Sequence, residues 1–402
     1  MQRSSVARAL IAGLCATLIG VGFARFAYTP LLPPLIAQRW FPETSAVFLS
    51  AANLAGYLLG ALGGRWMAAR SSNVAVLRIM QLLVAAAFVA CAFPLSVPWF
   101  FVWRLLSGIA GGAIVVLVAA AILPSVPKER EGAGSGAIFL GVGVGIAASG
   151  TLVPALLTHV GLRGTWIGLG LVSLALTLAN WTAWPQPSHK PQLQAAPKSA
   201  LERAASARRY GSTLLDVVYG CMAAGLVPPM LFFVDFVARG LRDGAGEASL
   251  LWIVYGIGSM CGPIAYGWLT DRLGATRAIR CTLFLQIAAL AGLSVSSNDV
   301  VLAVAAFVVG SFPPGIVPLT LGWLREIYPN DAQRQNAKWS RATVVFAVSQ
   351  AVAAYAYSAI FVDSVRDYRL LFVIATAAII AAAALELFVP LAFRRRSHER
   401  AA

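Results

Sequence analysis

Two arginines lie inside long apolar segments of this 402-residue chain, where a charge is costly. Arg25 falls within residues 9–36 and Arg104 within residues 99–124. A guanidinium near the middle of a membrane span is tolerated only where it faces a cavity or a partner. Arg25 therefore predicts a central site for an anionic or electron-rich solute, and Arg104 predicts a second cationic contact or a structural anchor. The alternative is that both guanidiniums bind backbone carbonyls or Asp235.

Other polar side chains within the apolar segments could face the same cavity. They are Tyr28, Asn53, Tyr219, Tyr255 and Gln350. Together with the two arginines they form the predicted solute-binding set.

Few carboxylates are available for a process that moves protons. Of the 16 Asp and Glu residues, Asp235 and Asp216 on one segment come nearest to the membrane interior, while the 3 His lie in predicted loops or in the tail. Proton transfer needs a titratable group, so Asp235 and then Asp216 are the predicted proton-coupling residues. Glu326 and Glu386 lie at segment ends, where we expect them to be solvated.

The composition indicates an integral membrane protein. The chain is 59% hydrophobic and 12% charged, against about a quarter charged in soluble domains. Its net charge of +15 does not indicate nucleic-acid binding, because the Lys and Arg residues gather in alternate connections, as basic residues on the cytoplasmic side do. The 5 Cys lie in or beside apolar runs without a C-x-x-C pair, so we expect reduced thiols and no metal or cofactor.

Apolar runs predict an all-α fold with twelve transmembrane helices. The predicted spans are 9–36, 46–68, 75–94, 99–124, 133–158, 165–184, 212–237, 248–270, 278–294, 300–324, 339–361 and 369–391. The polar segment 185–211 divides them into an N-terminal half, 1–184, and a C-terminal half with its tail, 212–402. The bias of basic residues places this linker and both termini in the cytoplasm.

The two halves resemble each other in sequence. An offset of 202 residues superposes Trp66 on Trp268 and Gly108 on Gly310. One register that holds across several spans predicts a duplication, with two six-helix halves related by a pseudo-two-fold axis along the membrane normal. Such halves can rock about a central site and expose it alternately to the two sides of a membrane.

The most specific motif joins spans 248–270 and 278–294. It runs G-W-L-T-D-R-L-G-A-T-R from Gly267 to Arg277 and resembles G-x-x-x-D-R-x-G-x-x-x-R, the loop signature of the major facilitator superfamily, with its last Arg one residue earlier than in the pattern. Asp271 can lie against the positive N-terminus of a neighbouring helix and latch a closed state. The predicted cytoplasmic gate residues are Gly267, Asp271, Arg272, Gly274 and Arg70. In the first-half copy Ala69 stands where the motif has Asp.

Three further segments resemble the same superfamily. Residues 103–112 resemble its R-x-x-x-G-x-x-G pattern, and G-F-A-R-F-A-Y-T-P-L-L-P at 22–33 resembles the YbfB/YjiJ-type branch. Residues 141–150 resemble the antiporter motif G-x-x-x-G-P-x-x-G-G, but Ile146 replaces its proline; close packing of small residues is the alternative explanation.

The resemblance implies a secondary active transporter in the inner membrane of a bacterium. It would move a small organic solute by alternating access, coupled to protons, and work as a monomer in the lipid bilayer. Efflux of drugs or metabolites by antiport is one alternative, and a non-transporting receptor or scaffold is an alternative of another class. We expect no enzymatic activity, because no set of catalytic residues lies at one depth in the predicted spans. We expect no direct use of ATP, because the sequence has no phosphate-binding loop.

Overall fold

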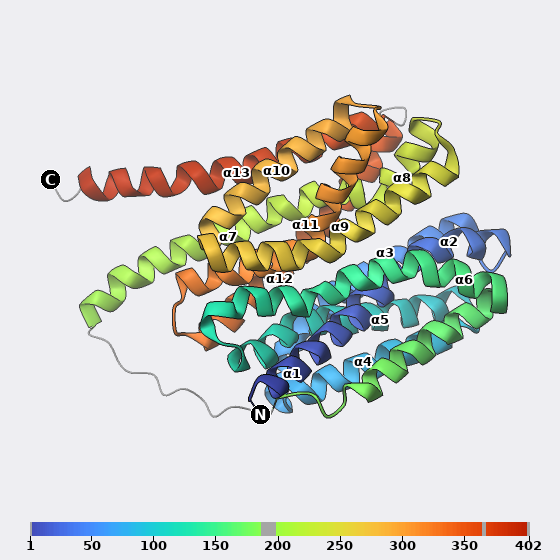
Figure 1. The fold of residues 1–402 in the computed structure, drawn as a ribbon, viewed down its shortest axis with the longest axis horizontal. Helices are drawn as coiled ribbons and strands as arrows, with labels where there is room; N and C mark the ends of the chain where they lie inside the picture. The colour runs from blue at the N-terminus through green and yellow to red at the C-terminus, as the bar shows by residue number, and fades with distance from the viewer. Residues whose placement is uncertain (1, 186–197, 364–366, 400–402) are drawn as a thin grey trace.

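The computed structural model describes residues 2–185, 198–363 and 367–399. Every regular element in these residues is a helix, so the predicted all-α character is found throughout the described part of the chain. Figure 1 shows an elongated helical bundle.

The first part of the chain holds nine helical elements. They are α1 (Gln2–Thr17), the π-helix η1 (Leu18–Phe26), α2 (Tyr28–Ala37), α3 (Glu43–Arg70), α4 (Asn73–Cys91), α5 (Val97–Ile122), the short turns η2 (Leu123–Ser125) and η3 (Lys128–Arg130), and α6 (Glu131–Ala179). Serine caps begin two of them: Ser72 Oγ accepts from Ala75 N before α4, and Ser96 Oγ accepts from Trp99 N before α5.

The second part follows the residues 186–197, which lie outside the described chain. Its elements are α7 (Lys198–Leu231), α8 (Phe233–Asp235), the π-helix η4 (Phe236–Gly240), α9 (Gly244–Leu273), α10 (Ala275–Val295), α11 (Asp299–Ile327), α12 (Ala332–Asp363) and α13 (Tyr368–Glu399). Helix α7 therefore begins within the segment 185–211 that the sequence predicts to be a linker. Gly274, whose φ of 79° favours glycine, separates α9 from α10.

The helices of the two parts gather on different sides of the bundle. In Figure 1, α1–α6 lie in the lower part of the view and α7–α11 with α13 in the upper part. Helix α6 packs against α9 and α11, and α12 packs against α3 and α5, so these helices join the two parts. We call the end toward the left of Figure 1, where α5 leads into α6, α9 into α10 and α11 into α12, the latch end.

Helix α6 is longer than a membrane is thick. Its 49 residues would extend about 74 Å, whereas the hydrocarbon core of a bilayer measures about 30 Å. Gly161 interrupts it with a φ of 69°, a conformation that favours glycine. The chain turns back there, at the end of the bundle opposite the latch end (Figure 1).

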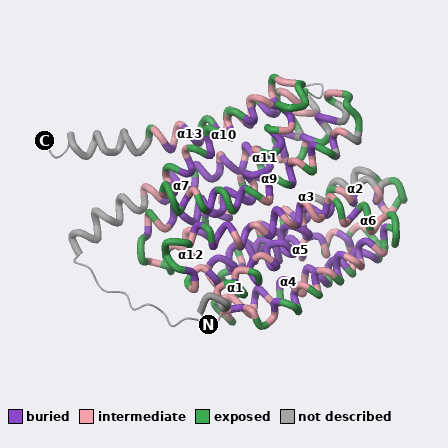
Figure 2. Tube along the Cα trace, viewed as in Figure 1, coloured by how far each residue is buried: buried purple, intermediate pink, exposed green. Residues whose placement is uncertain are grey.

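The described helices are those of a multi-pass membrane protein. Ten of them are long and apolar enough to cross a membrane. Large apolar side chains are exposed on the outer surface, for example Trp66 at 60% and Val295 at 74%. Figure 2 shows buried residues between the helices and exposed ones around the outside. An apolar outer surface of this extent suits lipid better than water.

Glycines bring neighbouring helices into backbone contact at corresponding places in the two parts. Between α3 and α5, Gly60 lies against the carbonyl of Ile109 and Gly108 against that of Asn53. Between α9 and α11, Gly262 lies against the carbonyl of Ser311 and Gly310 against that of Tyr255. A Cβ at any of the four glycines would collide with backbone, so each contact requires glycine.

Candidate functional site

A small cavity lies between the two parts of the chain. Its lining includes Arg25 of η1, Tyr57 of α3 and Phe139 of α6 from the first part, and Tyr219 of α7 and Gln350 of α12 from the second. Its volume of about 50 Å³ exceeds the roughly 30 Å³ that one water molecule occupies in the liquid. Pockets that bind organic ligands hold about 300–1,000 Å³, so this conformation is closed around its centre.

Arg25 reaches this cavity from the π-helix η1. Its side chain is partly buried, and Nη2 donates to Oε1 of Gln350 at 2.9 Å. The guanidinium also lies 5.4 Å from the ring centre of Phe26. Among the described residues no carboxylate contacts it, so its charge is met by an amide oxygen and by aromatic rings.

Arg104, Asn53 and Tyr28 lie behind Arg25, within the first part of the chain. Arg104 is 3% exposed and Nη1 donates to the carbonyl of Ala24 at 2.7 Å, which also accepts from Asn53 Nδ2 at 3.3 Å. The Arg104 guanidinium lies 4.3 Å from the ring centre of Tyr28. None of the three lines the cavity of this conformation, and their contact with a solute stays a prediction.

The two predicted tyrosines of the second part have different surroundings. Tyr219 lines the cavity, with its ring centre 4.9 Å from that of Phe346 and 6.2 Å from that of Trp339. Tyr255 is fully buried and stacks on Trp252 at 4.7 Å, and it does not line the cavity. The structure therefore brings Arg25, Tyr219 and Gln350 together at one cavity.

Neither candidate proton-coupling carboxylate is among the described residues that line that cavity. Asp216 is 5% exposed, and its Oδ2 lies 2.9 Å from Nε of Arg341. The side chain of Asp235 lies outside the described residues, although its backbone ends α8. Proton coupling through either residue stays a prediction.

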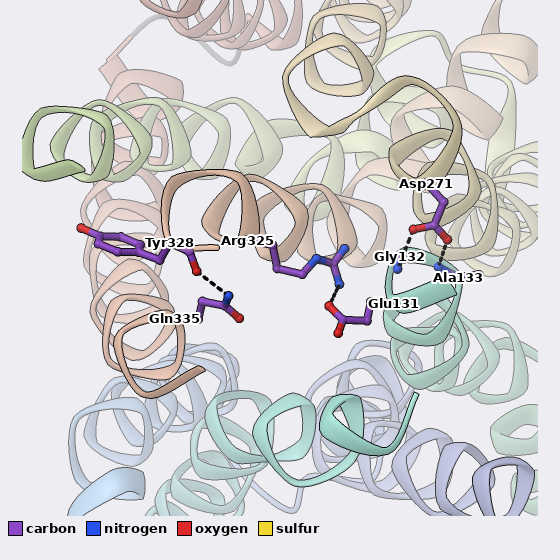
Figure 3. Close-up of polar contacts among 7 residues, drawn as sticks. All are labelled: Glu131, Gly132, Ala133, Asp271, Arg325, Tyr328 and Gln335. Atoms are coloured by element: carbon purple, nitrogen blue, oxygen red, sulfur yellow. Dashed lines mark hydrogen bonds and ion pairs between the residues drawn. The ribbon is translucent and has the colours of Figure 1, made fainter. Parts of the chain in front are cut away.

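At the latch end, Asp271 binds the N-terminus of a helix from the other part of the chain (Figure 3). Its Oδ1 accepts from Gly132 N and its Oδ2 from Ala133 N, both at 2.8 Å. Backbone N–H groups in the first turn of a helix have no partner within the helix and carry positive partial charge. Gly267 lies against the Gly132 carbonyl, so the two helices touch at these glycines.

The other predicted gate residues are not seen in this contact. Gly274 forms the turn between α9 and α10, while Arg272 and Arg70 are exposed. The Arg70 guanidinium lies 3.7 Å from the ring centre of Trp66, and that of Arg272 lies 5.4 Å from Trp268.

Sequence reasoning missed three residues that join the two parts. Arg325 Nη1 lies 3.2 Å from Glu131 Oε2, beside Asp271 (Figure 3). These residues border a pocket of about 630 Å³ that opens at the latch end. Deeper in the bundle, Nε1 of Trp339 on α12 donates to the carbonyl of Val115 on α5 at 3.0 Å. Glu131 and Arg325 each lie beside an end of a predicted span, 133–158 and 300–324, and that position was the one signal available for them.

The expected solvation of Glu386 is wrong. Its side chain is 1% exposed, and Arg280 donates to it through Nε at 2.6 Å and Nη2 at 3.0 Å. Helix α13 packs against α10 and turns this carboxylate inward, where a buried charge requires a partner. Glu326 is exposed as expected, yet it accepts from Ala275 N at 2.6 Å at the start of α10.

Comparison with known proteins identifies the family. A family model described as "Uncharacterised MFS-type transporter YbfB" matches residues 17–386. A gallate transporter of Pseudomonas putida is 26% identical over 352 residues, which cover 77% of this chain and 78% of the relative. The structure of the proton:xylose symporter XylE bound to 6-bromo-6-deoxy-D-glucose has a TM-score of 0.69 at 15% identity, with 95% of both chains covered, and at that identity it shows the fold alone. The family match spans most of the chain, and this chain therefore belongs to the MFS-type transporters that the YbfB model describes, as its motifs predicted.

Proposed function

We propose that this chain is a secondary active transporter that carries a small organic anion across a bacterial inner membrane by alternating access. The observation that carries the proposal is Arg25, a guanidinium at a cavity between the two parts of the chain that is met by the neutral Gln350. A buried charge of this kind is costly without a counter-charge. An anionic solute supplies that counter-charge.

The architecture we propose is twelve spans in two halves, 1–184 and 212–402, joined by a cytoplasmic linker, 185–211. The ten membrane-length helices support it, because the longest of them, Lys128–Ala179, is broken at Gly161 and can supply two spans. Helix α3, with 28 residues, supplies one more. The bias of basic residues supports cytoplasmic termini, and the latch end would then face the cytoplasm.

Corresponding contacts in the two halves support a duplication. Gly60 and Gly108 meet carbonyls between α3 and α5, and the residues 202 positions later, Gly262 and Gly310, meet the corresponding carbonyls between α9 and α11. Sequence similarity alone could arise from small-residue composition. Matching partners across the same pair of helices are harder to obtain by chance, and they favour two equivalent units that rock against each other.

The gate at the latch end gives the rocking motion a mechanism. Asp271, the Glu131–Arg325 pair and the Trp339–Val115 hydrogen bond all join the two halves on the latch side. Breaking them would open a path from the cytoplasm to Arg25. Proton coupling through Asp235 or Asp216 and function as a monomer are parts of the same proposal.

The relatives are consistent with an anion as solute. Gallate, which the Pseudomonas putida relative is named for, is a carboxylate that is ionised at neutral pH. A guanidinium binds a carboxylate by charge-assisted hydrogen bonds, which are stronger than bonds to a neutral amide. A solute carboxylate should therefore bind the Arg25 guanidinium more strongly than the Gln350 amide does.

Binding to the purified full-length protein tests the proposal. We expect carboxylates to raise its unfolding temperature and Arg25→Ala to weaken that binding about 10- to 100-fold, since a hydrogen bond to a charged group contributes roughly 1.5–3 kcal/mol. Arg163→Ala is the matched control, because this exposed arginine also stacks on an aromatic ring, that of Phe93 at 4.3 Å. Carboxylate binding that survives in Arg25→Ala, or stabilisation by cationic drugs alone, would contradict the proposal.

A further inference from the structure

Aromatic rings form part of the wall of the central cavity, beside valines, prolines and a methionine. Side chains of Phe26, Tyr57 and Phe139 line it from the first half, and those of Tyr219 and Phe346 from the second. Aromatic surface from both halves therefore surrounds the one guanidinium among the described lining residues.

The rings on the latch side of this cavity form a continuous packed group. Tyr219 and Phe346 have ring centres 4.9 Å apart at 33°, within the 4.5–7 Å range of favourable aromatic pairs. The ring centre of Trp339 lies 6.2 Å from that of Tyr219 and 6.5 Å from that of Phe139 in the other half. We call Phe139, Tyr219 and Phe346 the ring subsite. Phe139 belongs to the first half, and Tyr219 and Phe346 belong to the second.

The polar groups of the cavity are too few for most classes of solute. Beside Arg25 the described lining offers the amide of Gln350 and the hydroxyls of Tyr57 and Tyr219. At the lining of this conformation, a dicarboxylate would leave its second charge without a partner, and a sugar would leave most of its hydroxyls without one, at a cost for each buried group. A cationic drug would be repelled by Arg25. The remaining class is a single carboxylate on an apolar body.

We propose that the solute is a flat aromatic monocarboxylate, with its carboxylate on Arg25 and its ring in the ring subsite. This inference depends on the proposed function, because it takes Arg25 as the carboxylate contact. The oxygen of Gln350 holds the position on Arg25 Nη2 that a carboxylate oxygen would take. Since Arg25 and Gln350 belong to different halves, the arriving solute breaks a hydrogen bond between the halves, and binding is thereby linked to their movement.

Two carboxylates that differ in their rings test this inference on the unaltered full-length protein. Benzoate and cyclohexanecarboxylate carry the same charge and six-membered rings, but only benzoate is flat and aromatic. We expect benzoate to bind about threefold to tenfold more tightly, from the known strength of aromatic pairs. We expect Phe346→Leu to remove this preference. Phe372→Leu is the control and should keep it, because Phe372 is fully buried in α13 against Phe236, outside the cavity lining.

The outcomes separate this inference from the proposed function. Equal binding of both carboxylates that still requires Arg25 would refute the ring subsite and leave anion transport standing. A benzoate preference that persists in Phe346→Leu would also overturn the assignment. Binding of neither carboxylate would refute this inference, and the wider carboxylate test with Arg25→Ala would then decide on the proposed function. The comparison of the two probes needs no variant, so it decides the question even where Phe346→Leu fails to fold.

Discussion

Replacement of Asp271 by Asn should open the latch end. The carboxylate of Asp271 accepts from the N–H groups of Gly132 and Ala133, at the start of a helix in the other half. Asn keeps one acceptor oxygen, so one of the two N–H groups loses its partner, and the negative charge facing the positive helix end is lost. The closed conformation loses both contributions, whereas the open conformation, with these groups in water, loses neither.

The size of the effect follows from these two losses. A charge at a helix terminus contributes about 0.3–1 kcal/mol, and one hydrogen bond contributes about 0.5–1.5 kcal/mol net. Asp271 is an exposed residue, so water and salt screen its charge and the lower part of the combined range applies. A shift of about 1 kcal/mol changes the ratio of closed to open molecules about fivefold, since RT is about 0.6 kcal/mol.

Distances between spin labels across the latch end would measure this ratio. Cysteines replacing the exposed Glu129 and Gln333 place one label on each half, after the exposed Cys261 and Cys281 are changed to serine. In lipid nanodiscs, Asp271→Asn should raise the ratio of molecules at the longer distance to those at the shorter distance about fivefold. High salt should produce a smaller shift of the same sign in the unaltered protein.

Glu326→Gln provides the matched control. Glu326 is also an exposed carboxylate at a helix N-terminus, where it accepts from Ala275 N, but both residues belong to the same half. It should change the distances between the halves little. An unchanged distribution in Asp271→Asn, or an equal shift in Glu326→Gln, would refute the latch.

Three more substitutions have defined outcomes. Arg104→Ala should lower the unfolding temperature in detergent more than Arg163→Ala does, because the Ala24 carbonyl loses a charge-assisted hydrogen bond of roughly 1.5–3 kcal/mol. Equal unfolding temperatures of the two variants would contradict the role of Arg104 as a structural anchor. Trp339→Phe keeps a ring but removes the hydrogen bond to Val115, so the spin-label distances should shift toward the open form by a factor of about five or less, and no shift would count against that bond as a lock. Asp235→Asn should abolish uptake driven by a pH gradient in proteoliposomes while solute exchange continues, and intact pH-driven uptake would remove Asp235 as the coupling residue.

Some properties of this protein depend only on the composition of each segment. Hydropathy identified a multi-pass membrane protein and the helical segments, because a run of about 20 apolar residues has no other stable conformation in lipid. The motif around Asp271 and Arg272 identified the superfamily, which the family match confirms. These features are local in the chain, so neighbouring residues contain the information.

Which side chains meet was decided by the tertiary structure. Arg25 and Tyr28 are three residues apart and would share a face of a regular α-helix, at about 100° per residue. The π-helix η1 and the start of α2 separate them, so that Arg25 lines the cavity and Tyr28 meets Arg104. Wider helical turns at 18–26 change the direction of every later side chain, and no apolar pattern reveals them.

The same reason explains two further pairs of partners. The sequence by itself indicated that Asp271 could bind a helix N-terminus, but the choice of Gly132 and Ala133 depends on how the two halves are placed. Glu386 lies at the end of an apolar segment, where we expected solvation, but the rotation of α13 against α10 buries it on Arg280. A single sequence determines what each helix is made of, whereas the rotation of each helix and the docking of the halves determine which groups form a site, because those contacts join residues that are far apart in the chain.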